Sequence, residues 1–341
     1  MKNYRALSSL LVLISLGCLY SCKAPQRLAW KLKPQETYTV NVHLVSDLAM
    51  MFAGVDHKDT RMALDCRVKQ LDEKQRAEVE VTISSLKAGF STLGRKFSFD
   101  SDNDPGLKTP AKGKAGQEQT FINAFTGLKG QKYTVLVDPE QQEIKLLKMD
   151  DLINKAAYAG SGGSMLGGDQ VTQLLAAGNL QEYVTGGLFT GMGTSPAKLN
   201  KSWTRIASIV VPYAPVIPTL NTYTITKIET LPGKKGRKND EIVRINYKVT
   251  DAEASSDSGQ HRNRKNKSHS KKSFSVESIE GEGEIIFSLS AGHLLSLNEK
   301  TKVFVKSKFS RRTNPSKDQK KRKPPKIFYT VQKTIEYVEK Q

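Results

Sequence analysis

Alternation of apolar and polar residues is the sequence feature that most restricts how this chain can fold. Every second residue is apolar from Tyr38 to Leu44, from Met62 to Val68 and from Ala77 to Ile83. The same period returns from Val243 to Val249. Successive side chains of a β-strand point to opposite faces, so each segment predicts a strand with one buried face and one wet face. This pattern is typical of curved antiparallel sheets.

The predicted strands fall into two groups on either side of a segment with helical spacing. We expect an N-terminal β lobe in residues 35–148, a helical insert in residues 149–195 and a C-terminal antiparallel β lobe in residues 196–341. Asp169 is the predicted N-cap of a helix in the insert. The predicted fold class is mainly β with a helical insert (α+β), in which the middle helices cover one face. A similar opening strand at both ends of the chain leaves open two related β lobes.

The C-terminal group contains one long strand that glycine interrupts. Its predicted strands are Trp203–Val211, Asn221–Leu231, Glu241–Thr250, Phe274–Leu289, Leu294–Lys308 and Ile327–Val338. Gly281 and Gly283 lie inside the long strand, where we expect a bulge or a bend. The apolar phase also slips between Ile225 and Ile228, which predicts another bulge. If the last four strands form a meander, alternate connections leave from the same end of the sheet.

Much of the positive charge of the chain lies in two segments that are nearly free of aliphatic residues. The chain has 53 Lys and Arg against 34 Asp and Glu, a formal net charge of +19. Residues 252–273 and 310–326, here called the basic segments, have the composition of solvated loops. The predicted meander places both at one end of the sheet, where they would form one anion-binding patch. The candidate residues are Arg262, Arg264, Lys265, Lys267, Lys271, Lys272, Arg311, Arg312, Lys320, Lys321, Arg322 and Lys323.

The N-terminus has the three parts of a secretory signal. Lys2 and Arg5 precede an apolar run, and Leu19-Tyr20-Ser21-Cys22 follows it. This tetrapeptide resembles the bacterial lipobox, in which the cysteine receives acyl chains and becomes the first mature residue. We therefore expect a signal peptide in residues 1–21 and a tether in residues 22–34, held to a membrane by acyl chains on Cys22.

The remaining cysteine and the first mature residues add to this picture. Cys66 would be the one cysteine left beside the lipidated residue, so no intramolecular disulfide is expected. It lies in the apolar phase of its segment, which predicts a buried thiol. Lys23-Ala24-Pro25-Gln26-Arg27 contains no acidic residue. By resemblance to the sorting rules of bacterial lipoproteins, this composition implies an outer-membrane lipoprotein that faces the periplasm.

Three segments resemble an uncharacterised family of bacterial lipoproteins. Leu32-Lys33-Pro34-Gln35-Glu36-Thr37-Tyr38 resembles the L-K-x-G-x-x-Y opening of its mature chains, and Leu199-Asn200-Lys201-Ser202-Trp203 resembles its V-G-x-x-W segment. Gly281 to Phe287, followed by Gly292-His293-Leu294, resembles its G-x-G-x-x-x-F…G-x-L hairpin. Gln35 and Asn200 stand where the family has glycine. The resemblance implies the fold and the location, and it brings no established activity.

No complete catalytic motif occurs in the chain. Ser84-Ser85-Leu86-Lys87 and Ser195-Pro196-Ala197-Lys198 fit Ser-x-x-Lys, but the Lys-Thr-Gly of penicillin-recognising enzymes is absent. The histidines lack the H-E-x-x-H spacing of zinc hydrolases. We therefore expect no enzymatic activity, no cofactor and no metal site. Nucleic acid is not an expected partner, because both basic segments lack the aromatic residues that stack on bases.

Two functional hypotheses follow from these observations. The first is a non-enzymatic cell-envelope lipoprotein that binds an apolar or anionic amphipathic ligand or an envelope partner, with anionic lipid or lipopolysaccharide at the basic segments. The second is a periplasmic hydrolase whose active site is assembled from dispersed residues. For the basic segments, a purely solubilising role is the alternative. The sequence leaves the oligomeric state open.

Overall fold

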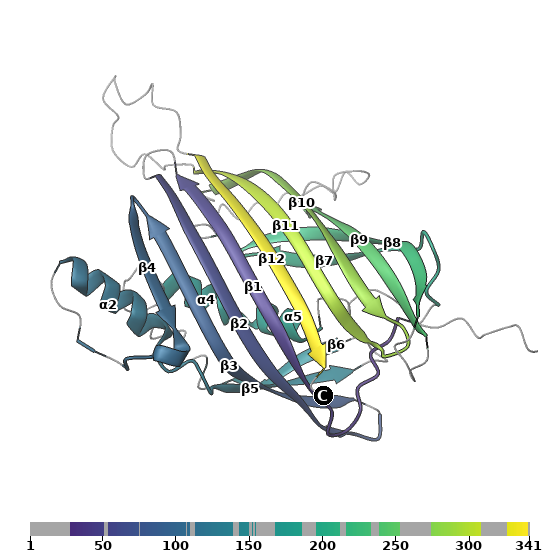
Figure 1. Ribbon diagram of the computed structural model, residues 1–341. Helices are drawn as coiled ribbons and strands as arrows, with labels where there is room; N and C mark the ends of the chain where they lie inside the picture. Colours follow the sequence, from purple (N-terminus) through teal and green to yellow (C-terminus); the bar gives the residue numbers. More distant parts are fainter. Residues whose placement is uncertain are drawn as a thin grey trace, which may run out of the picture.

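The structure is a computed structural model, and its strands form one antiparallel sheet (Figure 1). It describes residues 28–50, 54–74, 76–106, 108–109, 113–138, 143–149, 152, 154, 168–185, 196–211, 216–232, 239–252, 274–307 and 326–339. In these ranges, 12 strands join the sheet. The prediction of a mainly β, antiparallel fold is confirmed.

The N-terminal half of the chain supplies six of the strands and a helix. The strands are β1 (Thr37–Met50), β2 (Gly54–Leu71), β3 (Ala77–Thr92), β4 (Arg95–Asp100), β5 (Lys132–Asp138) and β6 (Glu143–Lys148). A 3-10 turn, η1 (Ser101–Asn103), and helix α2 (Lys114–Phe125) stand between β4 and β5. β5 and β6 are an antiparallel pair, with partners from Thr134 to Asp138 of β5.

The C-terminal half begins with two short helices and continues with six strands. The helices are α4 (Gly168–Leu174) and α5 (Ala177–Thr185). The strands are β7 (Ser202–Ile209), β8 (Ile217–Leu231), β9 (Asp240–Asp251), β10 (Phe274–Ser288), β11 (His293–Ser307) and β12 (Lys326–Glu339). Each predicted strand of this half is confirmed to within a few residues, since the two-residue period marks a half-buried strand closely.

The first and last strands are neighbours in the middle of the sheet. The strand order is β6-β5-β3-β2-β1-β12-β11-β10-β9-β8-β7, and β4 pairs with β3 beside this path. β1 pairs with β12 along its length, from Tyr38 opposite Glu339 to Met50 opposite Ile327. The two β regions are therefore the halves of one sheet, and the alternative that they are two related lobes stays a prediction. Pairing with β12 satisfies backbone groups that β1 would expose as an edge strand.

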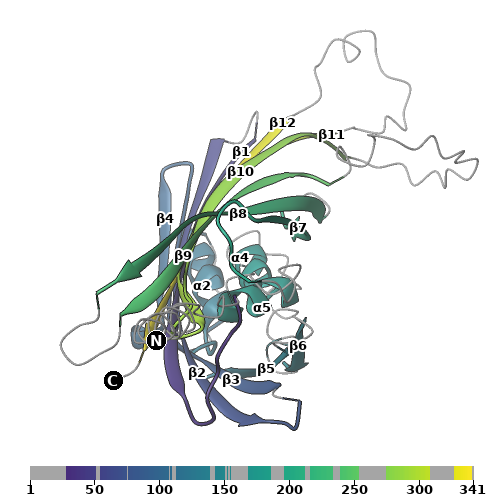
Figure 2. The same cartoon turned by 90° about the vertical axis from the view of Figure 1, so that its right-hand side faces the viewer.

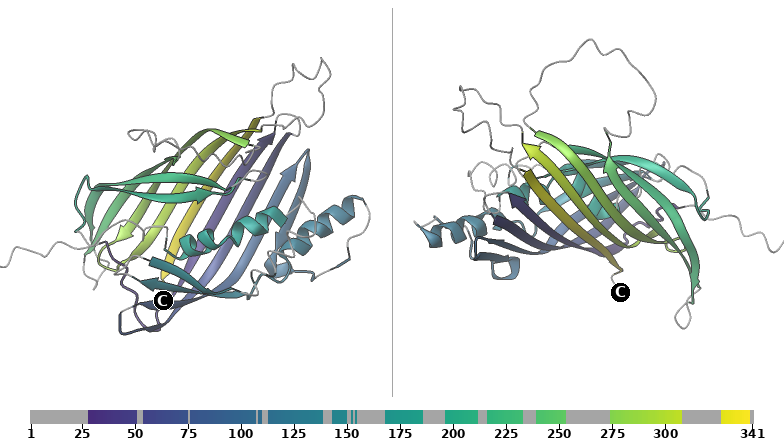
Figure 3. Two further views of the ribbon diagram at one scale, coloured as in Figure 1. Left: turned by 180° about the vertical axis from the view of Figure 1, so that it is seen from behind. Right: turned by 90° about the horizontal axis from the view of Figure 1, so that it is seen from above.

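The sheet curves around α4 and α5, which lie inside the curve between the β5–β6 side and the β7–β8 side (Figure 2). Seen from behind, both helices stand in front of this inner face (Figure 3). Inward-facing residues such as Val40, Val42 and Ile335 are at most 2% exposed. The Tyr133 hydroxyl donates a 3.3 Å hydrogen bond to the Leu180 carbonyl of α5. How far residues 149–195 cover the face stays a prediction, because much of that range lies outside the described residues.

The two glycines of β10 have a different role from the predicted one. The pairing of β10 with β11 is regular through Gly281 and Gly283, and its register shifts lie between Val276 and Ser278 and between Ile286 and Phe287. The expected bulge at the glycines is therefore wrong. A Cβ atom at position 283 would lie 2.5 Å from Tyr247 Cε1. Glycine is needed here because the neighbouring strand lays a large ring over the backbone. The slip near Ile225 is confirmed as a register shift between Ile225 and Lys227.

Different segments of the chain adjoin the two ends of the sheet. Phe274 pairs with Ser307, and Lys306 pairs with Lys326, so the strand ends that flank both basic segments meet at one end, here called the loop end. At the opposite end, here called the tether end, the Lys31 amide donates a 2.8 Å hydrogen bond to the Gly292 carbonyl in the β10–β11 turn. Within the described ranges, no helix is long and apolar enough to cross a membrane.

Candidate functional site

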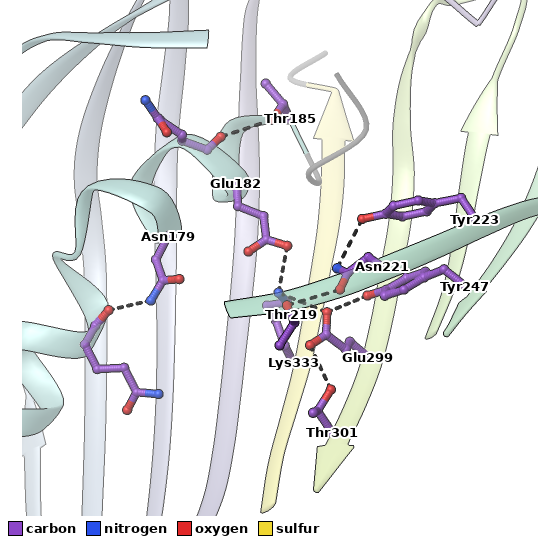
Figure 4. Close-up of polar contacts among 12 residues, drawn as sticks. Asn179, Glu182, Thr185, Thr219, Asn221, Tyr223, Tyr247, Glu299, Thr301 and Lys333 are labelled. Carbon is purple, nitrogen blue, oxygen red and sulfur yellow. Dashed lines mark hydrogen bonds and ion pairs between the residues drawn. The ribbon is translucent and has the colours of Figure 1, made fainter. Parts of the chain in front are cut away.

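Three charged side chains meet on the mainly apolar inner face (Figure 4). Lys333 of β12 lies directly opposite Glu299 of β11, and Glu182 reaches it from α5. The Lys333 Nζ atom is 2.8 Å from Glu182 Oε1 and 3.2 Å from Glu299 Oε2. The three side chains are 13%, 23% and 10% exposed, in the order Lys333, Glu182, Glu299. We call them the charged cluster.

Glu299 is held by hydroxyl groups as well as by Lys333. The Tyr247 hydroxyl donates a 2.5 Å hydrogen bond to Glu299 Oε2, and the Thr301 hydroxyl donates a 3.1 Å hydrogen bond to Oε1. Tyr247 is on β9, two strands from β11, and Gly283 of the intervening β10 is paired with both Tyr247 and Glu299. The missing side chain at position 283 lets the tyrosine reach across one strand.

Glu299 and Lys333 stay ionised at neutral pH. Burial would raise the pKa of Glu299, but the Lys333 ammonium and the hydrogen bonds from Tyr247, Lys333 and Thr301 outweigh it and hold the pKa below its ordinary value. Burial would lower the pKa of Lys333, but Glu182 and Glu299 outweigh it and raise that pKa well above its ordinary value. Breaking such a buried pair by removing one partner costs about 3–5 kcal/mol.

A small cavity of about 60 Å³ borders the cluster. Glu182, Tyr183, Glu299 and Lys333 line it, together with apolar residues such as Leu44. This is room for a few water molecules. The Tyr183 side chain is 1% exposed, and its hydroxyl has no hydrogen-bond partner among the described residues. The cavity therefore offers one unused hydroxyl beside three charges.

A row of aromatic rings leads from the β7 edge to the charged cluster. Trp203 stacks on Tyr223 with ring centroids 5.4 Å apart, and Tyr223 packs on Tyr247 at 4.9 Å. The Asn221 amide donates a 3.3 Å hydrogen bond to the Tyr223 hydroxyl. The row gives this part of the inner face a flat apolar surface with hydroxyl groups along it.

A wider depression of about 750 Å³ lies mainly against outward-facing side chains of β8–β11, such as Thr224, Asn246, Glu282 and Lys300. Glu282 and Lys300 are paired across β10 and β11, so opposite charges stand side by side. Such a mixture of charges and hydroxyl groups is typical of a solvated sheet face. We assign no ligand to it.

The charged cluster gives little support to hydrolysis. Both carboxylates are ion-paired with Lys333, and the lowered pKa of Glu299 makes it a poor proton donor at neutral pH. In the part of the chain that the structure describes, no group of three or more His, Cys, Asp or Glu is placed to hold a metal ion. If Glu182 moves away from Lys333, the lysine can bind one other anion in its place.

The residues that the sequence singles out lie elsewhere. Cys22 and all twelve basic candidates, from Arg262 to Lys323, fall outside the described residues, so their roles stay predictions. Cys66 is a buried thiol, as predicted. Sequence reasoning missed the charged cluster, although a signal existed: Lys333 stands in the apolar phase of Tyr329, Val331 and Ile335. A charged residue in a buried phase indicates a paired charge.

Comparison with known proteins identifies no family. No protein-family model matches the chain, and no curated protein matches its sequence. Lipovitellin, a protein studied for its lipid–protein interactions, aligns at 10% identity and a TM-score of 0.33, over 91% of this chain and 26% of its own. This chain thus spans about a quarter of lipovitellin.

Two bacterial structures align at lower TM-scores. An outer membrane channel from Pseudomonas putida F1 aligns at 7% identity and a TM-score of 0.21, over 91% of this chain and 97% of its own. A LolA superfamily protein from Nitrosomonas europaea aligns at 8% identity and a TM-score of 0.15, over 91% of this chain and 88% of its own. At these TM-scores, neither fold family nor function is transferred to this chain.

Proposed function

We propose that this protein is a non-enzymatic cell-envelope lipoprotein of the family that its sequence resembles, and that it binds an amphipathic ligand on the inner face of its sheet. The observation that carries the proposal is the pairing of a curved, apolar inner face with a separate helical cover, α4 and α5 (Figure 2). An acyl chain offers the same kind of surface as the side chains that now fill the face.

The helical cover is apolar where it meets the sheet. Its buried apolar side chains, with the adjoining Leu175, are Val171, Leu174, Leu175, Leu180, Tyr183 and Val184, and the polar Gln170 and Thr185 are buried beside them. Burying a side chain of this size contributes roughly 1.5–3 kcal/mol, and a buried methylene contributes about 0.8 kcal/mol. A long acyl chain can therefore replace much of what the cover contributes. It cannot bind beside the cover in the described arrangement, because the cavity holds only about 60 Å³.

Several polar contacts tie the cover to the sheet, among them the Tyr133–Leu180 hydrogen bond and the Glu182–Lys333 ion pair. Gln173 Nε2 donates a 2.8 Å hydrogen bond to the Tyr329 hydroxyl, and Gln181 Nε2 donates a 3.1 Å hydrogen bond to the Ile144 carbonyl. Gln170 bonds to Thr60 near the other end of the cover. Each neutral hydrogen bond contributes about 0.5–1.5 kcal/mol net. A ligand that displaces the cover has to replace these contacts as well as the apolar ones.

The proposed anchor and the basic segments leave the sheet at opposite ends. Five residues lie between Cys22 and Leu28, the first described residue, and the chain from Cys22 to Leu28 spans roughly 20 Å at most. The anchor therefore holds the tether end near the membrane. We propose that the basic segments at the loop end contact anionic lipid or lipopolysaccharide by charge attraction that weakens as salt rises.

Ligand binding is tested with the full mature chain carrying Cys22→Ala, which removes the acyl anchor and keeps every described residue. Native mass spectrometry is expected to show bound amphiphiles, and a fluorescent acyl-chain probe is expected to bind and to be displaced by unlabelled lipid. Val331→Ser, on the inner face beside the cavity, should weaken binding several-fold. Ile206→Ser, on the outer face, is the matched control and should not. A chain that binds neither natural amphiphile nor probe refutes the proposal.

A further inference from the structure

Glu182 is the one carboxylate that α5 carries, and α5 holds it against the sheet. Its Oε1 atom accepts a 2.8 Å hydrogen bond from Lys333 Nζ. Lys333 is its partner in every hydrogen bond and ion pair that the described residues give it. The contact therefore joins two layers, the helical cover and the sheet, through one ion pair in a mainly apolar interface.

Glu299 is attached very differently from Glu182. Its carboxylate receives hydrogen bonds from Tyr247 and Thr301 and an ion pair from Lys333, and all three belong to strands of the sheet. If the cover moves, Glu299 stays with Lys333 and only Glu182 departs. The ammonium group then keeps one carboxylate and has room for another, in a surface that is apolar around it.

The surroundings of Lys333 fit a ligand with an acidic head and an apolar body. Leu44 lies directly opposite Lys333 on β1, and Val331 and Ile335 flank it on β12. The 60 Å³ cavity reaches the cluster and contains the unused Tyr183 hydroxyl, so space beside the ion pair already exists before the cover moves. A head group can enter here while the remaining surface is still covered.

We propose that Lys333 is the head-group site for an acidic amphiphile, and that Glu182 occupies this site when no ligand is bound. The inference rests on the proposed function and specifies its ligand. The acidic head takes the place of the Glu182 carboxylate, and the apolar tail takes the place of the buried side chains of α4 and α5. A singly charged head restores the charge arrangement of the unliganded protein around Lys333.

A neutral head group fits the same place less well. The ammonium group would lose one of its two carboxylate partners to a weaker acceptor, and a buried charge with fewer partners is costly. A carboxylate and a phosphate share the chemistry that the site requires, which is an anionic oxygen on a long apolar chain. Fatty acids and phospholipid-like phosphates are the two sources that have to be told apart.

The test compares oleic acid, oleyl phosphate and oleyl alcohol by displacement of the acyl-chain probe, with the Cys22→Ala chain as the parent. The parent should bind either oleic acid or oleyl phosphate about tenfold more tightly than oleyl alcohol. The acid that binds more tightly shows whether the natural head group is a carboxylate or a phosphate. Glu182→Gln should tighten binding of acid and alcohol alike, by about tenfold, because it weakens only the unliganded state. Glu336→Gln, on the exposed outer face of β12, is the control and should change neither.

The role of Lys333 is isolated on the Glu182→Gln background. Adding Lys333→Gln there removes the cation without leaving Glu182 unpaired, and it should abolish the preference for acid over alcohol. Near-ultraviolet circular dichroism checks that each variant is folded. If all three ligands bind the parent equally and Glu182→Gln has no effect, the head-group site is wrong while the proposed function stands. If no ligand binds any variant, the proposed function itself fails.

Discussion

The ring of Tyr247 lies on the backbone of Gly283, and its hydroxyl reaches Glu299 on the far side of that strand. A Cβ atom at position 283 would stand 2.5 Å from Tyr247 Cε1 and 2.7 Å from the Asn298 carbonyl oxygen. Neither neighbour can retreat easily, since the ring is buried and the carbonyl belongs to a paired strand. The glycine therefore positions a hydrogen-bond donor of the charged cluster.

Gly283→Ala should lower the free energy of unfolding by about 1–3 kcal/mol, because it overpacks the contact with Tyr247. Urea unfolding followed by tryptophan fluorescence measures this loss. Gly178→Ala in α5 is the control, since no atom lies within 4 Å of a Cβ there, and it should leave stability equal or slightly higher. Equal stability of Gly283→Ala and the parent would show that the ring adjusts freely.

Acid should loosen the charged cluster. Glu299 has an unfolded pKa near 4.5, and its folded pKa is lower. Its contribution to stability is therefore complete above about pH 4.5 and disappears as the pH falls through the folded pKa. Urea unfolding between pH 7 and pH 3 should show this loss of stability. Glu299→Gln should be less stable than the parent at pH 7, and its free energy of unfolding should fall less as the pH is lowered. If the free energy of unfolding of parent and variant falls equally with pH, Glu299 does not contribute to the acid sensitivity of the protein.

The tether end depends on a buried tryptophan. Trp30 is 4% exposed and meets Phe287 and Tyr337 edge-on, at 6.3 Å and 6.4 Å between ring centroids. Trp30→Ala should reduce the free energy of unfolding by about 3–5 kcal/mol and expose the N-terminal segment to protease. Limited proteolysis with mass mapping detects the new cleavage, and Lys33→Ala, an exposed change nearby, should cleave like the parent.

The proposed anchor has a direct chemical test. Cys22→Ala should abolish incorporation of labelled palmitate, because the thiol is the first acyl acceptor. Cys18→Ala, which lies four residues earlier in the predicted signal, is the matched control and should label normally. Loss of label in the Cys18 variant alone would move the lipidation site and the start of the mature chain.

The alternation of apolar and polar residues predicted the strands well. It gave no information about which strands pair with β1. The alternating segments give Asp240–Asp251 and Lys326–Glu339 nearly as predicted, because burial of one face fixes a period of two. Nothing near Tyr38 or Glu339 shows that these residues pair, since strand partners far apart in sequence are chosen by the whole sheet. That one sheet joins the two β regions could therefore not be predicted from the sequence.

The charged cluster was partly visible in the sequence. Lys333 and Glu299 each interrupt an apolar phase, so a buried charge on each strand could have been predicted. Their cross-strand register follows from how β11 pairs with β12, and the local pattern does not specify that pairing. Glu182 lies on a helix, and its approach to Lys333 follows from how α5 packs on the sheet, which helical periodicity does not specify.

The pairing of β1 with β12 has a consequence for the order in which the protein can be completed. A chain is made from its N-terminus, so β1, β2 and β3 can assemble early, while β12, the partner of β1, follows more than 200 residues after β3. Until then, β1 presents an unpaired strand edge beside an apolar surface, the arrangement that recruits other chains into aggregates. Folding that begins with the N-terminal strands therefore passes through a stage at which β1 is open to pairing with another chain, and a chain cut short before β12 stays at that stage.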